Sequence, residues 1–249
     1  MLNLVVDIGN SAVKLAIFDH NKITFHQKKA SLSSTELQQL IYTKAIENVI
    51  VSSVKAGFSF TENEISKRVN YIQFNATTKI PVVNRYKSPE TLGLDRLAAV
   101  IGAQALIPKQ AALVIDAGTC ITYDHITEGG EYFGGSISPG IKMRFDAMHH
   151  FTAKLPQVKF DDTFNLPFGK NSADAISSGA VNGAIYEAEG FIKTFLSHHP
   201  AGKIILTGGD STFFDTKFKN SIFAHLILHE PNLVLIGLNT VVNYQHDLK

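Results

Sequence analysis

The chain lacks the features that mark secreted, membrane-spanning and nucleic-acid-binding proteins. It has one cysteine, Cys120, so no disulfide can form within it. It has no run of about 18 apolar residues, and its start lacks the basic region and cleavage site of a signal peptide. The net charge is +1, which gives no general reason to expect nucleic acid or a membrane surface as a partner. We therefore expect a cytoplasmic protein that binds neither.

The chain instead has the material for a packed core and a pattern that occurs twice. Its 249 residues are 45% hydrophobic and 18% charged, enough for one large domain or two of ordinary size. Each half opens with three strand-like runs and continues with helical stretches and further strands. The opening strands are expected at Leu2–Val6, Ala12–Phe18 and Ile23–Lys28, and again at Ala112–Ile115, Ile121–Ile126 and Tyr132–Ile137. The sequence predicts a duplicated α/β unit with subdomains 1–108 and 109–249.

Local signals predict several later elements. Ser33–Glu36 and Thr61–Glu64 each fit a capping box, which predicts one helix after Ser33 and a second that runs to about Val69. A proline in the first turn predicts that the last helix begins near Pro231. Other strands are expected at Asn48–Val54, Tyr71–Phe74, Ile80–Val83 and Lys203–Leu206. Helices are expected over Leu94–Leu106 and Ser172–His198 and from about Ile141, and the last helix is expected to end at Tyr244.

Both halves contain an apolar strand that ends in Asp-x-Gly and small polar residues. The copies are Asp7-Ile8-Gly9-Asn10-Ser11 and Asp116-Ala117-Gly118-Thr119. Glycine permits close approach of a ligand to the backbone, and a carboxylate beside it can hold a cation or a cation-bound phosphate. Lys14 adds a positive charge after the first copy. Either copy alone could be an ordinary hairpin turn, but the recurrence favours a clamp for a nucleotide triphosphate and its metal.

A second charged phrase, Leu92-Gly93-Leu94-Asp95-Arg96, stands at the start of an expected helix. Asp95 could simply complement the helix dipole, and Arg96 could be a surface charge. The alternative is chemical: Asp95 would accept a proton from a hydroxyl, and Arg96 would grip an anionic group of the substrate. The residues alone favour the first interpretation.

Glycines mark three further places. Thr207–Asp210 reads as a plain connection from a strand to a helix. Two glycine turns within Tyr132–Gly140 indicate that a ligand or another backbone approaches closely. Gly179 and Gly183 share one face of a helix, which fits either an intramolecular helix crossing or the approach of a ligand or a second subunit.

Five phrases in this order make the chain resemble the type III pantothenate kinases over nearly its whole length. They are Asp7–Ser11 with Lys14, Tyr86 to Arg96, Asp116–Thr119, Gly134–Gly140 and Thr207–Asp210. The resemblance implies the duplicated ribonuclease H-like fold of actin, sugar kinases and heat-shock ATPases, with mixed sheets flanked by helices. It also implies phosphorylation of pantothenate by ATP to 4'-phosphopantothenate, the first step of coenzyme A biosynthesis.

The resemblance also assigns roles to residues. Asp95 would be the general base. The pantothenate pocket would comprise Tyr86, Gly93, Leu94, Asp95, Arg96 and Ser172. ATP would be bound by Asp7, Ile8, Gly9, Asn10, Ser11, Ala12, Val13 and Lys14, and by Thr119 from the other side. Asp7 would hold Mg²⁺ through the phosphates, and Asp116 would bind K⁺ or NH₄⁺. A homodimer is implied, with the substrate pocket near the subunit interface. Ser11 and Ser172 stand where the family usually has threonine, and each keeps the hydroxyl.

Two other functions fit the same scaffold. One is a non-catalytic nucleotide-binding protein with an accessory or regulatory role, since a fold alone does not fix a function. The intact Gly93–Arg96 phrase favours the kinase over this alternative. The other is a chaperone-like ATPase with a peptide-binding module. The sequence up to Lys249 leads us to expect no further domain for such a module, which argues against this alternative.

Overall fold

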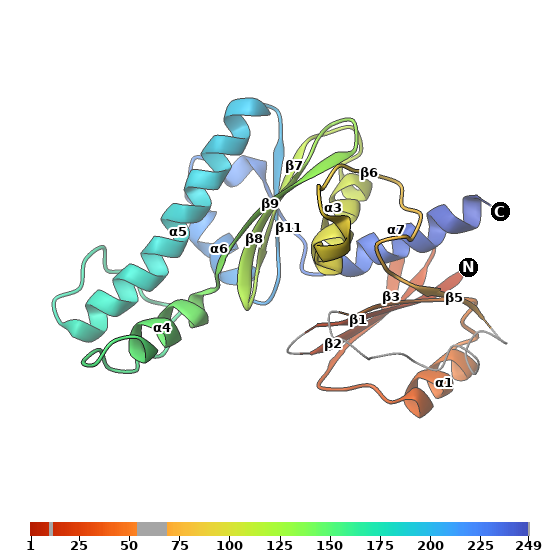
Figure 1. Ribbon diagram of the computed structural model, residues 1–249, viewed down its shortest axis with the longest axis horizontal. Coiled ribbons are helices and arrows are strands. Elements are labelled where there is room, and N and C mark those ends of the chain that lie inside the picture. Colours follow the sequence, from red (N-terminus) through yellow and green to blue (C-terminus); the bar gives the residue numbers. More distant parts are fainter. Residues whose placement is uncertain (10–11, 54–68, 249) are drawn as a thin grey trace. The chain divides into compact units, whose positions relative to one another are not determined.

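The chain folds into two compact units, each built on a mixed β-sheet. The computed structural model describes residues 1–9, 12–53 and 69–248 (Figure 1). Unit 1 comprises Met1–Lys109, Glu128–Phe133 and Asn232–Lys249, and unit 2 comprises Gln110–Thr127 and Gly134–Pro231. The C-terminal segment thus packs in unit 1, whereas the sequence groups it with 109–249.

The sheet of unit 1 has five strands in the order β3-β2-β1-β4-β5. The strands are β1 (Leu2–Ile8), β2 (Val13–Asp19), β3 (Lys22–Lys29), β4 (Asn48–Ser53) and β5 (Asn70–Gln73). Strand β1 pairs antiparallel with β2 and parallel with β4, so it lies at the centre with apolar neighbours on both sides.

Helix α1 (Ser34–Thr43) begins at the predicted capping box. The Glu36 backbone N–H donates to Ser33 Oγ at 3.2 Å, and the Ser33 backbone N–H donates to Glu36 Oε2 at 2.9 Å. A hydrogen bond from Lys29, together with those from Ser33, lowers the pKa of Glu36 to about 2. The second capping box, at Thr61–Glu64, lies outside the described residues.

Two helices of unit 1 cross at very short range. Helix α3 (Leu94–Leu106) and helix α7 (Leu233–Asp247) meet where each has a glycine. A Cβ added at Gly237 would lie 1.8 Å from Ala98 O, and one at Gly102 would lie 2.4 Å from Leu233 O. Only glycine at both positions lets the backbones approach this closely.

A line of asparagine side chains, of which Asn3, Asn48 and Asn239 are buried, attaches α7 to the sheet of unit 1. Asn3, Asn48 and Asn70 are register partners on β1, β4 and β5. Asn70 Nδ2 donates to Asn48 Oδ1 at 3.1 Å, and Asn48 Nδ2 donates to Asn3 Oδ1 at 2.9 Å. Asn3 Nδ2 donates in turn to Asn239 Oδ1 of α7 at 2.8 Å. These bonds satisfy polar groups that would otherwise be costly to bury, and they require one register and one position of the helix.

Unit 2 holds the second sheet, whose strand order is β11-β10-β7-β8-β9-β6. Its strands are β7 (Ala112–Ala117), β8 (Cys120–Ile126), β9 (Glu131–Pro139), β10 (Lys203–Thr207) and β11 (Ile227–His229). The first residues of β9 belong to unit 1, where they pair with the two-residue strand β6 (Val83–Asn84). The helices of unit 2 are α4 (Ile141–His150), α5 (Ser172–His198) and α6 (Ser211–Phe218), of which α5 is the long helix that runs beside α4 in Figure 1.

The structure corrects several expected elements. Strand β6 is confined to Val83–Asn84, because the chain before it forms turns instead of the strand expected over Ile80–Val83. Helix α7 begins at Leu233 after Asn232, so Pro231 precedes the helix. Helix α6 is the helix expected after Thr207–Asp210, whereas strand β11 was not anticipated. No described helix is long and apolar enough to cross a membrane.

The glycines of the second half have two different explanations. A Cβ at Gly135 would lie 1.9 Å from Tyr123 O, so the close backbone indicated by the glycine turns is that of the neighbouring strand β8. In α5, by contrast, a Cβ at Gly179, Gly183 or Gly190 would meet nothing within 4 Å in the described structure. Among the described residues, no helix therefore crosses α5 at these glycines.

We expect alanine to have opposite effects at Gly237 and Gly190. Gly237→Ala forces a Cβ into the α3 backbone and should lower the free energy of unfolding by about 1–3 kcal/mol. Gly190→Ala enters open space in a helix and should raise it by about 0.5–1 kcal/mol. Urea unfolding of both variants measures the two changes. Equal effects at the two positions would contradict the close crossing.

Candidate active site

The N-terminus of α3 presents a carboxylate and a guanidinium side by side in unit 1. Gly93 is the N-cap residue, and Asp95 and Arg96 lie in the first turn. Asp95 Oδ1 accepts the backbone N–H of Arg96 at 2.8 Å, which fixes the direction of the carboxylate. A Cβ at Gly93 would lie 2.6 Å from the same oxygen, so this position has little room for a side chain. Arg96 is 7% exposed, which excludes the simple surface charge considered above.

Two tyrosines extend this group. Arg96 Cζ lies 5.8 Å from the centre of the Tyr86 ring, a cation–π contact. Tyr86 stacks on Tyr132, with ring centres 6.3 Å apart and planes 8° apart. The structure therefore brings Tyr86, Gly93, Asp95 and Arg96 together, as predicted. Tyr132 was not among the predicted site residues, although it lies in a segment that the glycine turns had singled out.

The first Asp-x-Gly turn joins β1 to β2 in unit 1. Asp7 is the register partner of Lys14, and the Gly9 N–H donates to Ala12 O at 3.0 Å to close the turn. Asp7 is 7% exposed at the carboxyl end of a central strand, and Lys14 and Ala12 are half-buried. A carboxylate and a lysine thus flank one end of this sheet, where parallel strands commonly present ligand-binding groups.

The remaining residues of the first turn differ in what they can offer a nucleotide. Ile8 and Val13 are 1% and 3% exposed and belong to the core of unit 1, so only their backbones could face a ligand. Asn10 and Ser11 lie outside the described residues.

The second Asp-x-Gly turn joins β7 to β8 in unit 2, and a glycine turn packs against it. Gly208 has a φ of +95°, and a Cβ there would lie 2.3 Å from Asp116 Oδ1 and 2.3 Å from Ala117 O. The Asp210 N–H also donates to Ala117 O at 2.8 Å, and burial raises the pKa of Asp210. The segment Thr207–Asp210 is therefore more than the plain connection favoured above, because its glycine gives space to the Asp116 carboxylate.

Thr119 and Ser172 are both exposed in unit 2. Thr119 O accepts the Gly140 N–H at 3.2 Å, so the turn carrying Thr119 is pinned to the end of β9. Ser172 is the first residue of α5, next to the N-cap Asn171, whose side chain accepts the Asp174 N–H at 2.9 Å. Ser172 belongs to unit 2, whereas Tyr86 and Asp95 belong to unit 1.

The candidate metal-binding carboxylates, Asp7 and Asp116, fit metal ions that take most of their ligands from groups other than protein side chains. Within the described residues, no cluster of three His, Cys, Asp or Glu side chains could hold a metal ion. Mg²⁺ in phosphoryl-transfer sites is commonly bound through one or two carboxylates plus substrate phosphates, which a single buried Asp7 can satisfy. At Asp116, a carboxylate oxygen and the Ala117 carbonyl converge on the glycine turn. Such oxygen ligands suit a hard cation.

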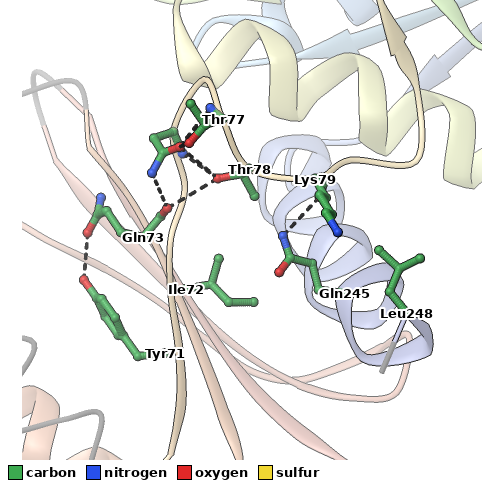
Figure 2. Close-up of a pocket in the computed structure, with 9 residues that line it drawn as sticks. Tyr71, Ile72, Gln73, Thr77, Thr78, Lys79, Gln245 and Leu248 are labelled. Carbon is green, nitrogen blue, oxygen red and sulfur yellow. Dashed lines mark hydrogen bonds between the residues drawn. The ribbon is translucent and has the colours of Figure 1, made fainter.

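A separate pocket of unit 1 lies between the end of β5 and the C-terminal part of α7 (Figure 2). Its volume is about 470 Å³. Two of its lining residues are joined by a hydrogen bond, in which Gln245 Nε2 donates to Lys79 O at 3.1 Å. The lining residues are Tyr71, Ile72, Gln73, Asn75, Thr77, Thr78, Lys79, Gln245 and Leu248. None of the predicted site residues is among them, so we do not assign this pocket to the reaction.

The fold defines the class of protein. A putative N-acetylmannosamine kinase from Listeria monocytogenes matches 99% of this chain and 100% of its own, with 12% identity and a TM-score of 0.57. A putative Baf family transcriptional activator from Campylobacter jejuni matches 98% of this chain and 99% of its own, with 22% identity and a TM-score of 0.61. These likenesses confirm the predicted fold class, a duplicated α/β plan shared with actin-like ATPases and sugar kinases.

Sequence similarity then gives the family. The type III pantothenate kinase profile matches residues 3–194. A type III pantothenate kinase from Phocaeicola vulgatus is 40% identical over 248 residues, which cover 99% of this chain and 100% of the relative. The chain belongs to the type III pantothenate kinase family.

Proposed function

We propose that the protein transfers the γ-phosphoryl group of ATP to the primary hydroxyl of pantothenate, giving 4'-phosphopantothenate for coenzyme A biosynthesis. Family membership over nearly the whole chain supports this reaction. The observation that carries the assignment to this site is the group at the start of α3, where Asp95 is oriented by the Arg96 N–H and Arg96 lies against Tyr86. The likeness to a transcriptional activator concerns the fold alone and does not favour the regulatory alternative.

Asp95 is the proposed general base. Its carboxylate would accept the proton of the pantothenate hydroxyl as that oxygen attacks the γ-phosphorus in line. The hydrogen bond from the Arg96 N–H leaves the carboxylate in one orientation before substrate arrives. Positioning of this kind and electrostatic stabilisation account for most of the rate enhancement in phosphoryl transfer.

Arg96 is the proposed partner of the pantothenate carboxylate. The guanidinium is mostly buried and rests on the Tyr86 ring, so it has little freedom to lose when it binds an anion. Gly93 and Leu94 would give the substrate access to the start of the helix. Ser172 stays a prediction for this pocket, because it rests on the resemblance alone.

Residues of each Asp-x-Gly turn are proposed to bind ATP. Asp7 would hold Mg²⁺ through the phosphates, and Lys14 would offset phosphate charge. Gly9, Asn10, Ser11 and Ala12 would offer backbone N–H groups to phosphate oxygens, and Ile8 and Val13 could contribute only their backbones. Thr119 would contact the phosphates from unit 2.

The cytoplasmic location expected from the sequence stays a prediction.

We expect Asp95→Asn to lower kcat by about two to four orders of magnitude, because it removes the proton acceptor but keeps the shape of the side chain. Binding of Mg·ATP should be nearly unchanged. Arg96→Lys is the matched comparison: it should raise the KM for pantothenate by about tenfold or more, because the bidentate fork is lost. Initial-rate kinetics with both substrates varied measures these effects. Near-wild-type turnover in Asp95→Asn would remove this residue from the mechanism.

Asp116 is the proposed site of a monovalent cation, K⁺ or NH₄⁺. Its support is the convergence of the Asp116 carboxylate and the Ala117 carbonyl at Gly208. We expect potassium to activate the wild-type enzyme, and Asp116→Asn to require a higher potassium concentration for half-maximal rate because a charged ligand is lost. A titration of the rate with potassium at constant ionic strength measures both. Equal rates in potassium and in sodium would contradict the assignment.

The protein is proposed to be a homodimer. The support comes from α5, where Gly179 and Gly183 have open space beside them within the described residues and Tyr186 is 63% exposed. Glycines cost helix stability, so an open glycine face has a use if a second backbone covers it. Sedimentation equilibrium should give twice the chain mass at assay concentrations. A single-chain mass under those conditions would overturn the proposal.

A further inference from the structure

A half-buried carboxylate in unit 2, Glu187, binds three side chains from three different elements. Tyr123 of β8 donates its hydroxyl to Glu187 Oε1 at 2.9 Å, and Ser138 of β9 donates its hydroxyl to the same oxygen. Arg144 of α4 donates from Nη2 to Glu187 Oε2 at 2.7 Å. Both oxygens of the carboxylate are therefore engaged. None of the predicted roles uses this residue.

Charge and partial burial strengthen the hydrogen bonds between Glu187 and its partners. The side chains of Arg144 and Glu187 are only 18% and 28% exposed, which limits screening by water. Burial favours the neutral acid, but hydrogen bonds from Ser138, Arg144 and Tyr123 outweigh it and hold the pKa of Glu187 below its usual range. Tyr123 is almost fully buried and stacks on Phe191 with ring centres 4.0 Å apart, so its hydroxyl has a fixed position. Charge-assisted hydrogen bonds such as these are among the stronger ones in proteins.

The cluster holds one corner of the chain, Ser138-Pro139-Gly140, from both sides. Glu187 accepts from Ser138, and Arg144 Nε donates to Pro139 O at 2.9 Å. The Gly140 N–H then donates to Thr119 O at 3.2 Å. A Cβ at Gly140 would lie 2.2 Å from Gly118 O, so the corner and the second Asp-x-Gly turn are in direct backbone contact.

We infer that Glu187 is a positioning residue for nucleotide binding, which holds the Ser138–Gly140 corner against the Gly118–Thr119 turn. The inference rests on the proposed role of Thr119 at the phosphates. Glu187 itself need not touch the nucleotide. Without its charge, the side chain at 187 loses the ion pair with Arg144 and one of its two acceptor oxygens, so Ser138 and Arg144 can no longer both be held as they are. The turn that carries Thr119 then loses part of the support on which its geometry depends.

The test compares two glutamates of the same helix. Glu187→Gln removes the charge from the cluster, whereas Glu189→Gln removes one whose ion pair, with Lys193 at 3.7 Å, has no link to the corner. Calorimetric titration with Mg·ADP should give a Kd about tenfold higher for Glu187→Gln and an unchanged Kd for Glu189→Gln. The KM for pantothenate should stay within about twofold in both variants, since neither glutamate is among the residues proposed to bind pantothenate.

Ser138→Ala gives a milder form of the same test. It removes only the hydroxyl that links Glu187 to the corner, so it should weaken Mg·ADP binding in the same direction if Glu187→Gln fails to fold. A lower melting temperature with an unchanged Kd for Mg·ADP would make the cluster purely structural and overturn the inference. Because ADP binding is measured without pantothenate, a wild-type protein that binds ADP but does not phosphorylate pantothenate would overturn the proposed reaction and not this inference. A wild-type protein that binds no ADP would overturn both.

Discussion

The backbone contact between α3 and α7 is the constraint on which the proposed site in unit 1 depends. Gly102 and Gly237 let the two helices meet without side chains between them, so their spacing has almost no freedom. Helix α3 carries Asp95 and Arg96 at its start, and α7 is tied to the sheet through Asn239 and Asn3. The same sheet ends in Asp7. One C-terminal helix thus fixes both the proposed base and the proposed phosphate-binding strand within this unit.

In unit 2, contacts between turns, and not between helices, hold the second Asp-x-Gly turn in position. The turn that begins at Asp116 is contacted by Gly208 on one flank and by Gly140 on another, and each contact excludes a larger residue. At Gly140 and Gly208 the missing side chain lets neighbouring backbone approach the turn closely. That backbone limits where the Asp116 carboxylate can lie. The charges of Arg144 and Glu187 then stabilise the Gly140 side. Two Asp-x-Gly turns of the same sequence pattern are held by different means.

Much of the fold could be predicted because its signals are local. The capping box at Ser33, the bounds of α3 and α5, and the strands around both Asp-x-Gly turns follow from nearby residues, as does the grouping of Gly93, Asp95 and Arg96. The return of α7 to unit 1 and the stacking of Tyr132 on Tyr86 could not, because each joins residues distant in sequence. The asparagine line was also missed, since polar residues inside strands give no periodic signal. The Glu187 cluster was missed as well, because the three side chains that bind Glu187 come from three elements distant from it in sequence.

The hydroxyl of pantothenate is the proposed acceptor of the phosphoryl group, and the other assigned roles follow from this reaction. The most direct measurement is the rate of ADP formation by the wild-type protein with Mg·ATP and potassium, before and after pantothenate is added. We predict a rate near background without pantothenate and a rise of several orders of magnitude with it, accompanied by one phosphorylated pantothenate per ADP. ATP hydrolysis that proceeds at the same rate with and without pantothenate would contradict the claim and favour a nucleotide-binding protein of another function.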